Sequence, residues 1–293
     1  MRVPRVSTAP CGHEPGQRPD PAGESAPSGS VAFSPTKGLP TVNSTWFRRF
    51  TPVGSGPRLF CFPHAGGSAT AYMQLARTLP SAFDVVALQY PGRQDRYREE
   101  PFTDLDALVG AVAAELAREL AADPGRPYAL FGHSMGALVA FETARLLARE
   151  ELPPPERLFL SGRGAPDGRD NEYGRFGEDD VLADVRRLGG TEQAMLEDPE
   201  ILEIVLPALR ADYRILGTVR WEGGESLDVP VTALTGDSDP MTTVDDMWTW
   251  RAHTTRDFGL KVFPGGHFYL FDQLRPVADA VTEGVAAART AAV

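Results

Sequence analysis

The 293-residue sequence contains only two cysteines, Cys11 and Cys61. No disulfide framework follows from so few, and a reducing cytoplasm is the compartment we expect. Basic residues are also scarce, with 29 Lys and Arg against 40 Asp and Glu and a net charge of −11. This charge argues against nucleic acid or an anionic membrane as a partner. No apolar run is long enough to span a bilayer, so we expect no membrane association.

Patterns that bind metals or nucleotides are absent as well. The sequence has neither the H-E-x-x-H nor the C-x-x-C spacing of zinc sites, and it has no Walker A motif. Residues 162–168 resemble a dinucleotide-binding loop only superficially, because the third glycine comes one position late and a proline occupies the turn. We therefore expect the protein to carry no metal and no cofactor of its own.

Residues 1–43 form an extension whose composition differs from the rest. Eighteen of the first 40 residues are Pro, Gly or Ser, and apolar residues are scattered among them without a period. Such a segment cannot bury enough surface to offset its ordering entropy, so we expect it to be disordered. It also lacks the apolar core of a secretory signal, and we assign it no catalytic role.

Residues 44–290 alternate continuous apolar segments with segments of helical periodicity. This alternation predicts an α/β fold with a mostly parallel central sheet covered by helices on both faces. The expected strands cover residues 58–62, 83–90, 128–131, 157–161, 229–234 and 259–263. The expected helices cover residues 74–79, 137–147, 272–290 and a long segment after Thr103, the predicted N-cap.

One stretch, residues 167–225, contains no convincing strand. It has helical periodicity over residues 178–188 and 200–216, with two glycines between these segments. Helices inserted between two core strands lie above the strand ends, where ligands bind in such sheets. We interpret this stretch as a lid over the site; the alternative is a helical pair without a functional role.

The pattern G-x-S-x-G occurs at residues Gly132-His133-Ser134-Met135-Gly136. An apolar strand precedes it and a helical segment follows it, which is the context of a nucleophile elbow. In such an elbow the serine hydroxyl stands exposed above the N-terminus of the helix, whose free N–H groups favour a developing negative charge. Ser134 is therefore the candidate nucleophile, although a bare G-x-S-x-G also arises by chance.

A serine hydroxyl needs a base before it becomes a good nucleophile. His267 follows the last predicted strand, and the two glycines before it allow the loop to bend over the sheet edge. We choose His267 as the base. The other four histidines are less suitable. His13 lies in the extension, and His64 lies in a loop whose shape we expect it to support. His133 is directly beside the serine and cannot fold back onto it, and His253 lies in a helical segment.

The base in turn needs a carboxylate to hold its tautomer. Asp237 and Asp239 both follow the strand at residues 229–234. Asp239 lies further from the strand end, before a proline that favours extended geometry, and we choose it. The resulting chain order Ser134, Asp239, His267 is the one found in α/β-hydrolases.

An oxyanion hole requires two backbone donors. The N–H after the nucleophile, that of Met135, is the first. The second is expected from the loop Pro63-His64-Ala65-Gly66-Gly67-Ser68, where we assign Ala65, with Gly66 as the next choice.

Beyond the elbow, several sequence blocks occur in the order of one known family. Over residues 45–285 the chain resembles the type II thioesterases, free-standing α/β-hydrolases that accompany polyketide synthases and nonribosomal peptide synthetases. The blocks are Phe62–Gly67, Tyr90–Arg93, Gly132–Ala137, Ser161–Arg163, Leu206–Tyr213 and Gly265–His267. The resemblance implies Ser134 as nucleophile, Asp239 as acid, His267 as base, and Ala65 with Met135 as oxyanion donors.

A contrast with the chain-releasing thioesterase domains fused to synthases sharpens this resemblance. Many of those domains carry the acid on the strand soon after the serine helix. Here that position reads Ser161-Gly162-Arg163-Gly164, and no carboxylate follows until Asp167. This difference favours the free-standing type.

The resemblance implies an acyl group on the phosphopantetheine arm of an acyl or peptidyl carrier domain as the substrate. The enzyme would remove stalled or wrong acyl units, and we expect it to act as a monomer. Apolar lid residues are candidates for an acyl pocket, namely Leu182, Met195, Leu196, Ile201 and Leu206. Basic residues are candidates for docking an acidic carrier, namely Arg93, Arg96, Arg98, Arg163 and Arg175, although acidic residues are interspersed among the first three.

Two other functions remain open from the sequence. A carboxylesterase or lipase on the same fold would use the same three residues. A hydrolase-fold binding protein without activity is a different class, which the complete and correctly ordered set of three argues against.

We predict that deleting residues 1–40 leaves turnover of a thioester substrate unchanged, because we place the whole catalytic apparatus after this extension. Steady-state rates of the full and shortened chains measure this. A large loss of rate would contradict the assignment.

Overall fold

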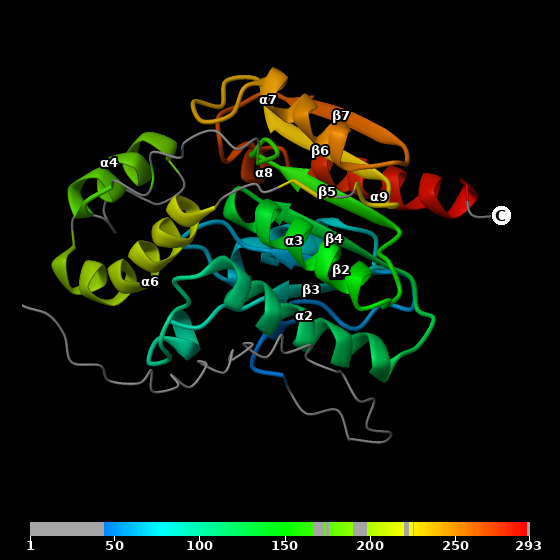
Figure 1. The fold of residues 1–293 in the computed structure, drawn as a ribbon, viewed down its shortest axis with the longest axis horizontal. Helices are drawn as coiled ribbons and strands as arrows, with labels where there is room; N and C mark the ends of the chain where they lie inside the picture. The colour runs from blue at the N-terminus through cyan, green and yellow to red at the C-terminus, as the bar shows by residue number, and fades with distance from the viewer. Residues whose placement is uncertain are drawn as a thin grey trace, which may run out of the picture. The chain divides into compact units, whose positions relative to one another are not determined.

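The computed structural model describes residues 44–166, 173, 176–189, 198–219, 223–224 and 226–291. Their centre is a seven-stranded sheet in the order β1-β3-β2-β4-β5-β6-β7 (Figure 1). The strands are β1 Phe47–Arg48, β2 Arg58–Phe62, β3 Asp84–Leu88, β4 Tyr128–His133, β5 Arg157–Ser161, β6 Val231–Gly236 and β7 Phe258–Phe263. Strands β2 to β7 pair in parallel, and β1 pairs antiparallel with β3.

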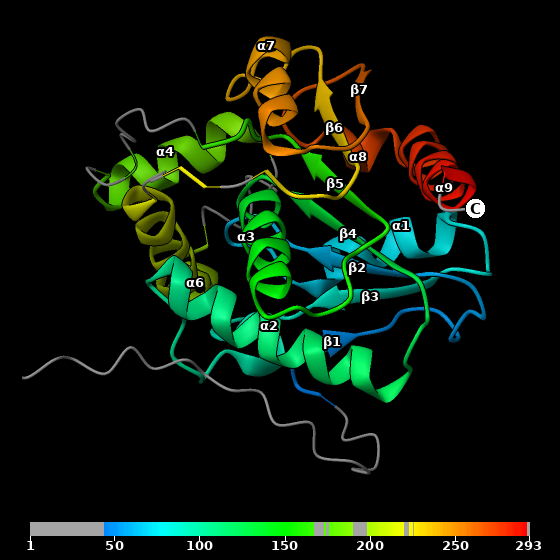
Figure 2. The ribbon, with the colours of Figure 1, turned by 45° about the vertical axis from the view of Figure 1, so that its right-hand side comes forward.

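Helices cover both faces of the sheet. Helices α2 (Leu105–Ala122) and α3 (Met135–Arg149) lie on one face, and α1 (Met73–Thr78) and α9 (Leu274–Ala291) lie on the other (Figure 2). Each face has its own apolar core: in β4, Tyr128 and Leu130 pack toward α2 and α3, whereas Ala129 and Phe131 pack toward α1 and α9. Strands buried on both faces need continuous apolar sequence, which explains why β2 to β6 show no polar alternation.

The predicted α/β fold with a mostly parallel central sheet is confirmed, with shifts at the ends of elements. The N-cap of α2 is Asp104 rather than Thr103, and its side chain accepts a hydrogen bond from the N–H of Ala107. The segment around His253 is a short helix α7 (Val244–Trp248) followed by a 3₁₀ turn over Thr249–His253. The two-residue strand β1 was not predicted, because so short an edge strand has no detectable periodicity.

Two helices occupy the stretch interpreted as a lid. They are α4 (Glu178–Leu188) and α6 (Pro199–Thr218), which lie together beyond one end of the sheet (Figure 1). Val181 of α4 and Leu209 and Tyr213 of α6 form a small core of their own. The extension 1–43, with Cys11 and His13, and the lid residues Met195 and Leu196 lie outside the described residues.

None of the helices within the described residues is long and apolar enough to cross a membrane.

Strand β4 and helix α3 approach each other closely at the elbow. A Cβ on Gly132 would lie 2.1 Å from the carbonyl oxygen of Gly136, and a Cβ on Gly136 would lie 1.9 Å from the carbonyl oxygen of Phe62. Both contacts are with backbone, which cannot move aside as a flexible side chain can. Only glycine therefore fits at either position.

We predict that Gly136→Ala lowers the free energy of unfolding by at least about 2 kcal/mol, because the added methyl group overlaps backbone atoms. The matched control is Gly110→Ala in helix α2, where an added Cβ meets nothing within 4 Å. That control should gain roughly 0.5–1 kcal/mol, since alanine is the better helix former. Urea unfolding of the three proteins measures both changes, and equal midpoints would refute the close-approach argument.

Candidate active site

Ser134 occupies the sharp turn between β4 and α3. Its backbone has φ 55° and ψ −118°, a conformation that non-glycine residues rarely adopt. The turn is held by two hydrogen bonds, from the N–H of Ser134 to the carbonyl of Ser161 at 2.8 Å and from the N–H of Ala137 to the carbonyl of Ser134 at 3.0 Å. Strain at a turn that the surrounding structure enforces is typical of a functional position.

His267 and Asp239 are hydrogen bonded to each other. His267 Nδ1 lies 2.8 Å from Asp239 Oδ2, and both side chains are buried, at 1% and 0% exposure. The other carboxylate oxygen of Asp239 accepts hydrogen bonds from the N–H groups of Met241 at 2.8 Å and Thr242 at 3.3 Å. A carboxylate fixed in this way determines which imidazole nitrogen carries the proton, and it leaves Nε2 of His267 as the basic atom.

Asp237, the rejected alternative, has a different position. It is exposed, and its Oδ1 accepts hydrogen bonds from the N–H of Gly265 at 3.1 Å and from the hydroxyl of Ser238 at 2.8 Å. These two bonds, the first above all, lower the pKa of the Asp237 carboxyl. Asp237 therefore holds the loop that carries His267, whereas Asp239 contacts the imidazole itself.

The sheet topology explains how distant residues meet. Ser134, Asp239 and His267 follow β4, β6 and β7, and the carboxyl ends of these parallel strands share one edge of the sheet. The loop after β7 approaches the end of β6 so closely that a Cβ on Gly236 would lie 2.2 Å from the carbonyl oxygen of Gly265. The ring of His267 consequently lies 4.9 Å, between centroids, from the ring of His133, the residue before Ser134.

Two of the histidines not chosen as base, His133 and His64, lie near the site. His133 is buried, and its Nδ1 lies 2.9 Å from the hydroxyl of Ser161, which in turn lies 2.7 Å from the hydroxyl of Tyr269. Burial lowers the pKa of His133 well below its ordinary value, so the ring stays neutral. Burial, with the charges of His267 and Arg93, also lowers the pKa of His64 to about 3.

The loop after β2 is pinned on several sides. The hydroxyls of Tyr72 and Tyr90 donate to the carbonyls of Phe62 at 2.6 Å and Pro63 at 3.3 Å. The N–H of Gly66 donates to Asp212 Oδ2 at 2.7 Å, and the N–H of Gly67 donates to the carbonyl of His64 at 2.9 Å. Because Gly66 and Gly67 have partners inside the protein, Ala65 is the stronger candidate for the second oxyanion donor. Met135 begins helix α3, where the first N–H groups have no partner within the helix.

The docking role considered for Arg93 and Arg96 is wrong, because both side chains are only 6% exposed. Arg93 forms an ion pair with Asp212, and Arg96 pairs with Glu99 and donates to the carbonyl of Gln89 at 2.8 Å. From the sequence alone these arginines are expected at the surface, because the residues that pair with them are not known. Arg98 is exposed, Arg163 is half-buried, and Arg175 lies outside the described residues.

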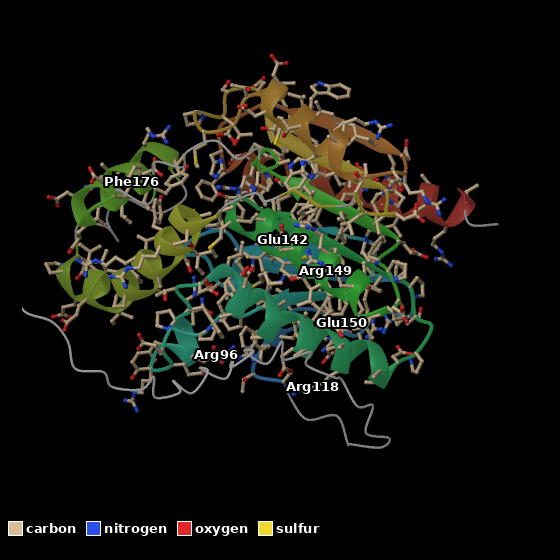
Figure 3. All side chains as sticks on the ribbon, viewed as in Figure 1. Arg96, Arg118, Glu142, Arg149, Glu150 and Phe176 are labelled. Atoms are coloured by element: carbon tan, nitrogen blue, oxygen red, sulfur yellow. The ribbon has the colours of Figure 1, made fainter. Side chains whose placement is uncertain are left out.

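Aromatic and apolar side chains gather between helices α4 and α6. Tyr213 stacks against Phe176, whose position next to α4 is labelled in Figure 3, with centroids 6.0 Å apart. The half-buried Leu206 packs against this cluster, and Leu182 and Ile201 are also half-buried. These three residues keep apolar surface available on α4 and α6.

Asp212 was not singled out from the sequence. It is 2% exposed and belongs to helix α6, and it accepts a hydrogen bond from the loop after β2. The sequence does contain a signal for its burial, because Asp212 lies one helical turn from Leu209 and Ile215, on the apolar face of an amphipathic helix.

A mostly parallel sheet with a strained serine at a strand–helix turn defines an α/β-hydrolase. The family profile described as Thioesterase domain matches residues 57–284. The thioesterase PikA5 of Streptomyces venezuelae is 41% identical over 248 residues, which are 84% of this chain and 87% of that protein.

Solved structures agree with these sequence matches. The type II thioesterase BorB from the borrelidin biosynthetic cluster is 41% identical, with a TM-score of 0.73 over 83% of this chain and 98% of BorB. RedJ, a thioesterase from the prodiginine pathway in Streptomyces coelicolor, is 35% identical, with a TM-score of 0.71 over 78% of this chain and 85% of RedJ. The chain belongs to the thioesterase family, and its resemblance to type II thioesterases is confirmed.

We predict that Asp239→Asn lowers kcat by about 10³–10⁴-fold, because an amide cannot hold the required His267 tautomer or stabilise the imidazolium. The matched control is Asp237→Asn, two residues away, which keeps an oxygen able to accept from Gly265 and should lose less than about tenfold. Steady-state hydrolysis of a small acyl thioester compares the two variants. The assignment fails if Asp237→Asn is the more damaging change.

Proposed function

We propose that this protein is an editing thioesterase that removes stalled or wrong acyl groups from the phosphopantetheine arms of acyl or peptidyl carrier domains. The hydrogen bond between His267 and Asp239, placed beside the elbow of Ser134, is the observation that carries the proposal. Membership of the thioesterase family supplies the substrate class. The phosphopantetheine belongs to the substrate, and the enzyme needs no cofactor for this reaction.

In the first half of the reaction Ser134 Oγ attacks the thioester carbonyl while His267 Nε2 takes the hydroxyl proton. Asp239 stabilises the imidazolium that forms. The N–H groups of Met135 and Ala65 would bind the oxyanion of the tetrahedral intermediate, in which the charge develops. The C–S bond then breaks, the pantetheine sulfur takes the proton from His267, and an acyl-serine ester remains.

In the second half a water molecule attacks the acyl-serine carbonyl. His267, neutral again, removes a proton from this water and then returns it to Ser134 Oγ as the ester bond breaks. The products are the free carboxylic acid and the regenerated serine. Because a thiolate is a good leaving group, the protein has mainly to orient the substrate, deprotonate the nucleophile and stabilise the oxyanion.

Breadth of substrate is expected from an acyl site lined by the lid. Apolar residues on α4 and α6 such as Leu182, Ile201 and Leu206 can contact an acyl chain but offer it no specific hydrogen bond. Two acyl chains that differ by one methylene group differ in binding free energy at an apolar surface by only about 1–3 kcal/mol. Tolerance of many acyl groups suits an enzyme that edits.

Location and assembly are part of the same proposal. Cys61 is a free, buried thiol, which is typical of a reducing compartment, and this supports a cytoplasmic enzyme. We propose that the monomer is active, because each residue assigned to the reaction comes from one chain.

A panel of acylated carrier domains tests the function directly. Wild type should release acids of varied chain length from the carriers, and Ser134→Ala should release essentially none. A serine-directed fluorophosphonate should label wild type at Ser134, and failure of labelling would favour a binding protein without activity. Faster hydrolysis of matched oxygen esters than of acyl-pantetheine thioesters would favour a carboxylesterase instead.

A further inference from the structure

Helix α6 carries a carboxylate on the face that it turns toward the sheet. Asp212 is 2% exposed and is flanked in the sequence by two buried residues, Ala211 and Tyr213. Burying a charge costs free energy unless the charge has hydrogen-bond or ion-pair partners. The partners of Asp212 therefore indicate its role.

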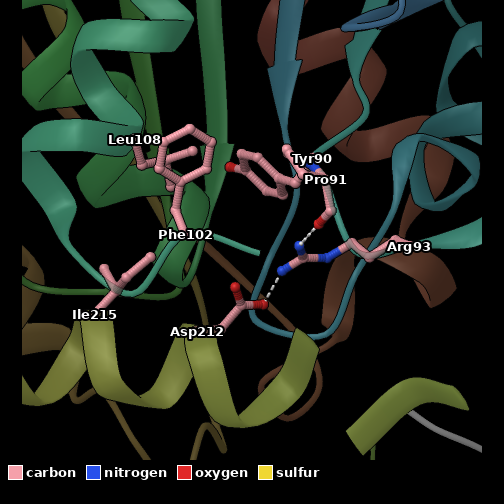
Figure 4. A pocket seen from close by; sticks show the side chains of 7 residues that line it. All are labelled: Tyr90, Pro91, Arg93, Phe102, Leu108, Asp212 and Ile215. Atoms are coloured by element: carbon pink, nitrogen blue, oxygen red, sulfur yellow. Dashed lines mark hydrogen bonds and ion pairs between the residues drawn. The ribbon is translucent and has the colours of Figure 1, made fainter. Parts of the chain in front are cut away.

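Both partners of Asp212 come from loops at the edge of the sheet. Its Oδ2 accepts from the N–H of Gly66 at 2.7 Å. It also accepts from the guanidinium of Arg93, which follows β3 (Figure 4). Arg93 itself is held by a hydrogen bond to the carbonyl of Pro91 at 2.8 Å and lies over the ring of Tyr90, 4.9 Å from its centroid. A single carboxylate thus joins the lid helix to two loops.

A second contact from α6 falls on the same glycine. Gly66 has φ +74°, and a Cβ there would lie 2.8 Å from Cδ1 of Leu209. Leu209 and Asp212 are three residues apart, so they project from neighbouring turns of the same helix face. Leu209 therefore packs against Gly66 while Asp212 holds its N–H, and α6 fixes both the position and the direction of this peptide.

The pair is placed where water competes little. The small cavity beside it, lined by Tyr90, Pro91, Arg93, Phe102, Leu108, Asp212 and Ile215, has no room for a water molecule (Figure 4). Burial raises the pKa of the Asp212 carboxyl, and the Arg93 guanidinium and the Gly66 N–H oppose that rise. Arg93 is thus the group that allows a charged acceptor to face the loop.

Resting on the proposed function, we propose that Asp212 is a positioning residue that sets the oxyanion hole from the lid. By holding the Gly66 N–H toward α6, it turns the adjoining Ala65 N–H toward the substrate oxygen. Helix α6 and the loop after β2, here called the oxyanion loop, consequently act as one rigid part. Displacement of α6 would remove a catalytic donor.

The test compares Asp212→Ala with Asp184→Ala. Asp184 is a matched control, because it is also a buried carboxylate of this helix pair, 6% exposed. It accepts from the hydroxyl of Tyr213 at 2.8 Å and pairs with Arg187, but it does not bind the loop after β2. With an acyl-N-acetylcysteamine thioester, Asp212→Ala should lower kcat about 100-fold, as the loss of one oxyanion donor does, with KM within about threefold. Asp184→Ala should change kcat by no more than about threefold.

Two inhibitors separate positioning from lid packing. An alkyl boronic acid, which forms a tetrahedral adduct on Ser134, needs the oxyanion donors; a non-hydrolysable acyl thioether binds without them. In Asp212→Ala the boronate affinity should fall in step with kcat, and the thioether Kd should stay within about threefold of wild type. Equal weakening of both ligands, or equal kcat in the Ala variants of Asp212 and Asp184, would overturn the proposal.

Asp212→Asn provides a conservative variant that keeps the shape of the side chain. Its amide oxygen can still accept from Gly66, so the loss of kcat should be partly rescued, to about tenfold, with boronate affinity again falling in step.

If Asp212→Ala does not fold, the same comparison is made between Asp212→Asn and Asp184→Asn, and unchanged kcat in Asp212→Asn would contradict the proposal. Hydrolysis by wild type, lost in Ser134→Ala, reports separately on the proposed function.

Discussion

The contact between the first turn of α3 and the end of β2 is the constraint on which the site depends. Gly136 lies so close to the carbonyls of Phe62 and Pro63 that no side chain can stand between them. This contact brings the start of α3 beside the loop that follows β2, so the N–H groups of Met135 and Ala65 come from neighbouring backbone segments. Ser134 lies two residues before this contact, in the same turn, and its φ is positive. The nucleophile and the two proposed donors therefore depend on one close approach of two backbones.

The two sides of the site are held by separate sets of bonds. On the side of the base, the chain after β6 is joined to the loop after β7 by backbone hydrogen bonds from Asp237 to Phe263 at 2.8 Å and from Ser238 to Gly265 at 3.0 Å. On the side of the proposed oxyanion hole, Tyr72, Tyr90 and Asp212 hold the loop after β2. The loop after β2 is thus bound directly to helix α6, whereas these two backbone hydrogen bonds hold the loop of His267 without any contribution from α6.

Much of the fold could be predicted because its signals are local. Apolar runs of strand length, the helical period of α4 and α6, and the glycines around Ser134 each report on contacts within a few residues. The choice of Asp239 over Asp237 also used local geometry, namely the distance from the strand end and the proline that follows, and the structure places Asp239 against His267. The partner of Arg93 could not be predicted in the same way, because Asp212 is 119 residues away and no local sequence pattern indicates that the two residues pair. Read locally, that arginine belonged to a charged surface loop, and only the fold shows it to be buried.

Gly162, at the end of β5, has a consequence for where an acid can be carried in this architecture. A Cβ there would lie 2.6 Å from Cε1 of His133 and 3.3 Å from Cε1 of His267. The strand adjacent to the serine thus ends in a space already filled by two imidazole rings. A side chain installed at Gly162 would therefore have to displace an imidazole ring. An acid at position 162 would therefore require a smaller residue in place of His133.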